Sequence, residues 1–245
     1  WDYEPAISEY RIYLKGYGEI AQSAGFSEQR VRYRIGNAYQ QWAQQADNSA
    51  SLLRQGIAQY DTLLAAGQNQ YTADAGFNRA LALQSLETPA SLAEAQTTYE
   101  SLLATSADRF GDRSLVQLAK LHLGAGAYDD AEEAATRLLA SATGGEYAEE
   151  AHLFQGLARQ GRGDLEEAVE AFAQISAGSD LFGRAALSAG HALVTLGRYT
   201  AAVATLEAGA PVADESQLAS FHYLTGQAYH ALGQRADALS QFGAG

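Results

Sequence analysis

The chain has 245 residues and a formal net charge of −13, from 29 acidic and 16 basic side chains. This charge disfavours a surface for nucleic acid or an anionic membrane, because both would be repelled. The sequence contains no cysteine, which excludes disulfides, thiolate catalysis and cysteine-ligated zinc. No apolar run approaches the ~20 residues of a transmembrane helix. The helix-forming residues Ala, Leu, Gln, Glu and Arg are abundant, a composition typical of helices.

The first ten residues, WDYEPAISEY, match the second half of a pattern that recurs later in the chain. Aligned with GDLEEAVEAF, they place Ala6 opposite Ala168 and Tyr10 opposite Phe172. The helix that should precede such a segment is absent. We therefore expect residues 1–25 to hold an isolated second helix with an uncovered apolar face. We also expect the chain to have been excised or processed from a longer protein.

The next segments fit helix pairs that carry insertions. IGNAYQQW reads as a first helix and SLLRQGIAQYDTLL as its partner, with Gly56 at a small position and Tyr60 at a large one. Further on, SLAEAQTTYESLL places Ala95 and Tyr99 at the same two positions, and YDDAEEAATRLL places Ala131 at the small one.

The pattern is regular in three later segments: GLARQGRGDLEEAVEAF, GHALVTLGRYTAAVATL and GQAYHALGQRADALSQF. They begin at Gly156, Gly190 and Gly226, so the period is 34 and then 36 residues. A glycine that ends the first helix favours the left-handed conformation of a turn. Small residues let two helices cross closely, and a large residue fills the space toward the next pair. The predicted helix pairs span residues 29–66, 72–106, 112–143, 149–177, 183–209 and 219–243.

This period and these residues resemble the tetratricopeptide repeat (TPR) family. The resemblance implies an all-α fold over residues 1–245, a single right-handed superhelical solenoid of antiparallel helix-turn-helix repeats. It also implies a non-catalytic scaffold that binds a peptide or a partner protein in a concave groove lined by the first helices. Two alternatives stay open: a self-assembling structural module that associates through its open ends, and a regulatory or targeting segment of a larger multidomain enzyme.

The resemblance further implies which side chains face the groove. The candidate partner-binding residues are Arg30, Tyr33, Asn37, Phe77, Asn78, Arg113, Lys120, Leu153, Leu157, Arg184, His191, Tyr223, Gln227 and His230. The full set of groove positions also includes Asp74 and Glu150, so it carries four basic and two acidic side chains. Its net charge is therefore positive, whereas that of the whole chain is −13. This favours a protein or peptide partner with acidic character or a free C-terminal carboxylate. The competing interpretation is that these arginines only balance acidic neighbouring helices.

Members of the family that grip a terminal carboxylate use five polar residues. Asn37, Asn78 and Arg113 match three of these positions, whereas Tyr33 and Gln117 stand where the family has a lysine and an arginine. We therefore do not expect a complete carboxylate clamp.

No residue pattern indicates catalysis, a metal or a cofactor. The five histidines lie outside any metal or triad motif, and acidic runs such as GDLEEAVEAF suit the first turn of a helix. We expect no enzyme activity, no nucleic-acid partner and no insertion into a membrane. The compartment stays open between a bacterial cell envelope and the cytoplasm.

Overall fold

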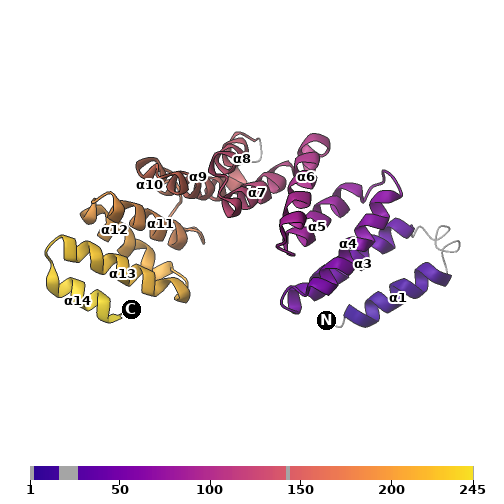
Figure 1. Cartoon of the computed structure of the whole chain (residues 1–245), viewed down its shortest axis with the longest axis horizontal. Coiled ribbons are helices and arrows are strands. Elements are labelled where there is room, and N and C mark those ends of the chain that lie inside the picture. The colour runs from indigo at the N-terminus through magenta and orange to yellow at the C-terminus, as the bar shows by residue number, and fades with distance from the viewer. Residues whose placement is uncertain (1–2, 17–26, 142–143, 245) are drawn as a thin grey trace. The chain divides into compact units, whose positions relative to one another are not determined.

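The computed structural model describes residues 3–16, 27–141 and 144–244 (Figure 1). Among these residues the regular structure is helical, and no strand occurs. The all-α solenoid expected from the sequence is therefore confirmed. The chain divides into two compact units, Trp1–Ser114 and Leu115–Gly245, which are described separately. No helix within the described ranges is long and apolar enough to cross a membrane.

The N-terminal unit is built from helices that pair with their neighbours in sequence. Its helices are α1 (Tyr3–Gly16), α3 (Glu28–Gln45), α4 (Ala50–Ala65), α5 (Thr72–Gln84), α6 (Pro89–Thr105) and the first part of α7 (Ala107–Ala125). α3 pairs with α4 and α5 with α6, while α4 packs on α5 and α1 on α3. α3 and α5 are therefore first helices of hairpins, and α1, α4 and α6 are second helices.

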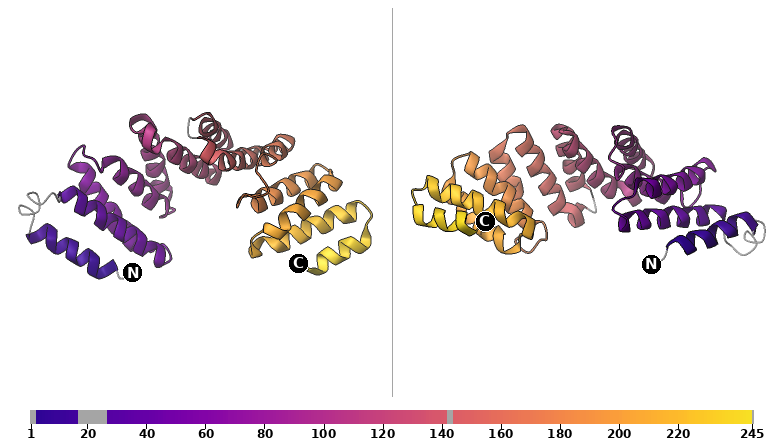
Figure 2. Two further views of the ribbon diagram at one scale, coloured as in Figure 1. Left: turned by 180° about the vertical axis from the view of Figure 1, so that it is seen from behind. Right: turned by 60° about the horizontal axis from the view of Figure 1, so that its bottom comes forward.

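The C-terminal unit continues this alternation after α7 (Figure 2). Its elements are α8 (Tyr128–Ala140), the 3-10 turn η1 (Gly144–Tyr147), α9 (Ala148–Arg162), α10 (Leu165–Phe172), α11 (Phe182–Thr195), α12 (Tyr199–Gly209), the 3-10 turn η2 (Ala210–Val212), α13 (Glu215–Ala231) and α14 (Arg235–Ala244). The hairpins are α9–α10, α11–α12 and α13–α14. The first helices α9, α11 and α13 also contact one another in that order, so they form one face of the unit.

The repeated glycines act where two helices of one hairpin meet. A Cβ atom added at Gly156 would collide with the ring of Phe172, and one added at Gly190 would collide with Leu206. Leu206 is also part of a core cluster with Phe221 of the next hairpin. The large residue therefore fills the space over the glycine of its own hairpin as well as the space toward the next one.

The turns and the close crossings follow the sequence pattern. The glycines that end the first helices have positive φ angles, between 71° and 91°; they are Gly126, Gly163, Gly197 and Gly233. The small residues of the later second helices are buried, and Ala168 and Ala202 are 0% exposed. Ala6 is the exception, because it lies exposed on α1.

Several boundaries differ from the sequence-based expectation. The second helix expected over residues 1–25 ends at Gly16, and residues 17–26 lie outside the described ranges. α7 begins at Ala107 rather than 112, and α13 begins at Glu215 rather than 219. Asp214 is the extended residue before α13 and is followed by an acidic first turn, which is a typical signal for the start of a helix. The alignment of the repeats gave the later start at residue 219. The expectation of one continuous array over residues 1–245 stays a prediction.

A cluster of ion pairs links α8, α9 and the turn that follows. Arg162 contacts Asp129 at 2.6 Å and Asp164 at 2.9 Å, and also pairs with Glu132. Arg159 contacts Glu132 at 2.7 Å. Burial alone would raise the pKa of Glu132, but its hydrogen bonds with Arg159 and Arg162 outweigh burial, so the net pKa is lowered.

This arrangement predicts an acid-sensitive contribution to stability. A carboxyl group whose pKa is lowered by folding stabilises the protein at pH values above the pKa that the group has in the unfolded chain. This stabilisation is lost as the pH falls through the pKa of the folded state. We expect Glu132→Gln to lower the urea midpoint at pH 7 and to make it less dependent on pH between 5 and 3. Urea titrations followed by circular dichroism measure both. The control Glu133→Gln changes an exposed neighbour and should behave as wild type; equal effects of the two variants would contradict the prediction.

Candidate interaction surface

The N-terminal unit brings three of the expected groove residues into one hydrogen-bond network. Asn78 Nδ2 donates to Asn37 Oδ1 at 3.0 Å and to the Tyr33 hydroxyl at 3.3 Å. The hydroxyl of Tyr60, a fully buried residue of α4, donates to the same Asn37 oxygen at 2.6 Å. Tyr33 also stacks on Tyr71, with ring centroids 5.6 Å apart. The Asn37 side-chain oxygen is therefore satisfied inside the protein.

Phe77 and Arg113 form a second group in this unit. Phe77 is only 1% exposed, so its expected place in the groove is wrong: the ring is a core residue stacked on Phe110 at 5.1 Å. The exposed Arg113 places its guanidinium carbon 4.2 Å from the Phe77 ring centroid. This cation–π contact holds the guanidinium against the ring.

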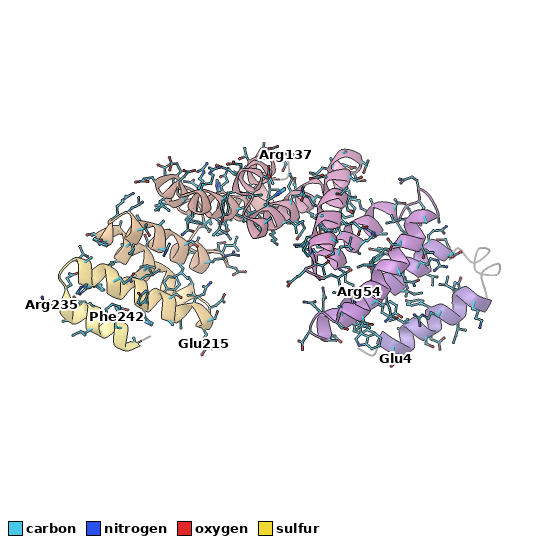
Figure 3. The ribbon with its side chains drawn as sticks, in the orientation of Figure 1. Glu4, Arg54, Arg137, Glu215, Arg235 and Phe242 are labelled. Carbon is cyan, nitrogen blue, oxygen red and sulfur yellow. The ribbon has the colours of Figure 1, made fainter. Side chains whose placement is uncertain are left out.

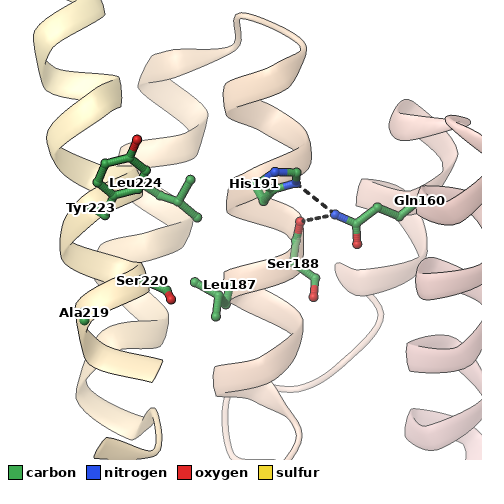
Figure 4. A pocket seen from close by; sticks show the side chains of 8 residues that line it. All are labelled: Gln160, Leu187, Ser188, His191, Ala219, Ser220, Tyr223 and Leu224. Carbon is green, nitrogen blue, oxygen red and sulfur yellow. Dashed lines mark hydrogen bonds between the residues drawn. The ribbon is translucent and has the colours of Figure 1, made fainter. Parts of the chain in front are cut away.

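Two hollows of the C-terminal unit lie between α11 and α13. Figure 4 shows the first of them. We call them together the α11–α13 furrow. One cavity of about 550 Å³ is lined by Gln160, Leu187, Ser188, His191, Ala219, Ser220, Tyr223 and Leu224. A second, of about 450 Å³, lies one turn further along and is lined by Val194, Tyr199, Gln227, His230, Ala231 and Phe242.

Helical spacing explains why these side chains converge. Residues three or four apart share a helix face, and the α13 side chains that line the furrow follow this spacing from Ser220 through Tyr223 and Gln227 to His230. Tyr223 is 57% exposed and its ring centroid lies 6.2 Å from that of Phe242. The furrow thus presents an open aromatic side chain above an apolar floor.

The polar groups of the furrow are amides, hydroxyls and imidazoles. Gln160 reaches from α9 to α11, where its Nε2 lies 3.2 Å from His191 Nδ1 and 3.5 Å from the Ser188 carbonyl oxygen (Figure 4). The contact links two successive first helices.

The furrow has no formally charged side chain. Residues 115–245 carry sixteen acidic and seven basic side chains, yet none of the residues that line either cavity is Asp, Glu, Lys or Arg. The acidic surplus of this unit therefore lies on its other surfaces.

The remaining candidate residues have varied environments. Leu153 is 1% exposed and belongs to a core cluster, against which the half-buried Leu157 packs; Leu153 therefore does not line a groove. Arg184 and Lys120 are exposed, and Arg184 lies one turn before Leu187 on α11. Arg30 lies in the first turn of α3, where its backbone N–H donates to the capping Ser27 hydroxyl. His191, Tyr223, Gln227 and His230 are the candidates that the furrow brings together.

The sequence-based mapping missed two aromatic residues of the furrow. Tyr199 and Phe242 belong to second helices, whereas the mapping considered first helices alone. Their signal was present in the repeat, because Phe242 is the large residue paired with Gly226 and Tyr199 directly follows a turn.

The histidines make separate contacts. His122 lies 4.0 Å from Asp130, and His222 lies 2.8 Å from Gln241. Across the described ranges, no group of three His, Asp or Glu side chains is placed to hold a metal ion.

The hairpins α9–α10, α11–α12 and α13–α14 each have a glycine at the crossing and a left-handed glycine at the turn, and their successive first helices are in contact. These features define a tetratricopeptide-like helical-repeat fold. Solved structures agree. The chain is similar to a tetratricopeptide repeat protein from Parabacteroides merdae, with a TM-score of 0.58 and 15% identity over 99% of this chain and 91% of that one. It is also similar to MamA, with a TM-score of 0.60 and 19% identity over 71% of this chain and 90% of that one. No protein-family model and no curated protein sequence matches the chain.

Proposed function

We propose that the protein is a non-catalytic interaction scaffold that binds an extended segment of a partner protein in the α11–α13 furrow. The observation that carries this proposal is the combination of open volume, an exposed aromatic side chain and uncharged polar groups on one face of the C-terminal unit. Sites that recognise peptides commonly combine apolar pockets with a few polar groups that fix orientation.

The lining residues indicate how such a segment would bind. Leu187 and Leu224 form an apolar floor for one large side chain of the partner, beside the Tyr223 ring. An extended backbone has N–H and C=O groups that must be satisfied when they are covered. Gln227 and Ser220 can both donate and accept, so they suit this backbone.

The acidic character expected of the partner also enters the proposal. Arg184 is exposed beside the furrow, and a carboxylate of the bound segment would meet it there. In the N-terminal unit the stacked Arg113 offers a similar fork of donors to an acidic side chain.

A peptide selection tests the furrow. Twelve-residue peptides would be selected from a random phage library against the whole chain, and their affinities measured by fluorescence anisotropy. We expect Ser220→Arg, which obstructs the furrow, and Tyr223→Ala, which removes its exposed ring, each to weaken binding about tenfold, or roughly 1.4 kcal/mol. Ser101→Arg adds the same side chain to an exposed site on α6 and should leave affinity unchanged. Peptides that bind Ser220→Arg as tightly as wild type would contradict the proposal.

Self-association is a second candidate function, supported by a different observation. On α14, Leu239 is 72% exposed and Phe242 is 45% exposed. Phe242 is labelled in Figure 3. Apolar side chains grouped on one helix commonly mark an interface. Multi-angle light scattering at several protein concentrations tests this: a mass that rises with concentration and falls with Leu239→Asp would support self-association, and a constant monomer mass would exclude it.

A further inference from the structure

We propose that a second docking surface on the C-terminal unit, formed by α10 and α12 over α11, binds a basic amphipathic helix of a partner protein. A cavity of about 330 Å³ opens between these two second helices. It is separate from the α11–α13 furrow, shares no lining residue with it and does not depend on the function proposed there.

The walls of this cavity are mostly apolar. Val169 and Phe172 stand on the α10 side and the small residues Ala204 and Ala208 on the α12 side, while α11 contributes three alanines and Phe182. Ala204 and Ala208 are exposed, so a partner can approach the backbone of α12 closely. The volume lies at the lower end of the roughly 300–1,000 Å³ that ligand pockets span, which suits one or two large apolar side chains.

The chemistry of the lining favours a helix over an extended segment. Thr205 is the only lining residue with a polar side chain. An extended backbone laid here would bury N–H and C=O groups without partners, which is costly. A helix satisfies these groups internally, and an amphipathic helix can place apolar side chains three or four residues apart in such a cavity.

The charged residues near the cavity indicate which charge the partner helix should carry. Glu166 and Glu170 are exposed on α10, one turn apart, and each lies three positions before a lining residue, Val169 or Ala173. Their carboxylates have no ion pair among the contacts of the described residues, whereas Glu132 of the same unit pairs with two arginines. Neither α10 nor α12 contains a lysine or an arginine. The polar face of the bound helix should therefore carry Lys or Arg beside its apolar stripe.

A model amphipathic helix tests the proposal on the whole chain. The probe is the fluorescein-labelled, amide-capped peptide LKKLLKLLKKLLKL, with LEELLELLEELLEL as its charge-reversed counterpart, and anisotropy is the readout. We expect the lysine peptide to bind and the glutamate peptide not to bind. Ala208→Trp, which fills the cavity without a change of charge, should weaken binding about tenfold. The double variant Glu166→Gln/Glu170→Gln should weaken it and reduce its dependence on salt.

Controls separate docking from general attraction to an acidic protein. Ala93→Trp places the same side chain on exposed α6 and should bind as wild type, as should Ser220→Arg in the furrow. Ala204→Lys is a second blocking variant should Ala208→Trp unfold the unit. Wild-type affinity in both Ala208→Trp and Ala204→Lys overturns the proposal. A dimer that Ala208→Trp converts to a monomer in light scattering also overturns it, because a second copy would then cover the cavity.

Discussion

Gly190→Ala should destabilise the C-terminal unit by about 1–3 kcal/mol, the usual cost of one carbon too many in a packed core. The added Cβ would collide with Leu206, which is fully buried in the crossing of α11 and α12. Denaturant unfolding followed by circular dichroism gives the free energy. The matched control is Gly124→Ala on α7, where an added Cβ meets nothing within 4 Å. There, alanine should stabilise by about 0.5–1 kcal/mol, because glycine is the poorer helix former.

A double mutant sharpens this prediction. Leu206→Ala alone should cost about 2–5 kcal/mol, because it empties a buried site. In the double variant the methyl group added by Gly190→Ala occupies part of that space, so the combined loss should be smaller than the sum of the single losses by about 0.5–3 kcal/mol. Strict additivity, or stabilisation by Gly190→Ala, would show that the glycine is not required for the crossing.

Alkaline pH should destabilise the N-terminal unit through two buried tyrosines. Burial raises the pKa of the Tyr60 hydroxyl, and Tyr33 adds to this effect, while the nearby side-chain amide of Asn78 opposes it. Burial also raises the pKa of Tyr99, partly opposed by the charge of Arg113. Both rings are 0% exposed. In the unfolded chain these hydroxyls ionise near pH 10.

The sign of the effect follows from proton linkage. The folded protein retains both protons above pH 10 while the unfolded chain releases them, so stability is intact below pH 10 and falls above it. The slope approaches about 1.4 kcal/mol per pH unit for each tyrosine. At pH 11 the unfolding free energy should therefore lie about 2–3 kcal/mol below its value at pH 9.

Urea titrations at pH 8, 9, 10 and 11, with phenolate absorbance at 295 nm, measure this loss. The double variant Tyr60→Phe/Tyr99→Phe should start less stable at pH 8, because Asn37 and Gln40 lose a donor, but should lose much less stability than wild type by pH 11. Tyr229 of the C-terminal unit contributes by the same linkage, because its hydrogen bond to Glu207, more than its burial, raises its pKa to about 12; Tyr229→Phe should therefore remove a separate part of the alkaline loss and leave the part due to Tyr60 and Tyr99 in place. The same pH slope in wild type and the double variant would contradict the assignment.

The local architecture could be read from the sequence because each hairpin repeats the same requirement. Gly163, Gly197 and Gly233 end a first helix with positive φ, a conformation that other residues rarely adopt. The buried alanines at the crossings follow from the close contact of two helices. The starts of the helices were harder to predict. The alignment of the repeats gave a later start for α13 than the one that its N-cap residue Asp214 indicates.

The expected site was harder to predict because helical position gives only the direction of a side chain. Phe77 and Tyr223 occupy groove positions of the same pattern, yet Phe77 is 1% exposed and Tyr223 is 57% exposed. The rings of Phe110 and Tyr99 both pack against Phe77, whereas the ring recorded near Tyr223 is that of Phe242, with the centroids 6.2 Å apart. Neighbours from other helices, which the pattern does not specify, decide whether a residue serves the core or a surface.

By itself the sequence determined the helical class, the order of hairpins and the residues at which they cross, since glycine, alanine and one large side chain at fixed spacing permit few other arrangements. The tertiary structure alone decided where open volume remains. The α11–α13 furrow combines side chains of α9, α11 and α13 with Tyr199 and Phe242 from second helices. The α10–α12 cavity exists because small side chains of α12 face apolar ones of α10 over the alanines of α11. Both hollows are the space left by side chains distant in sequence, and that space is fixed only when the helices pack.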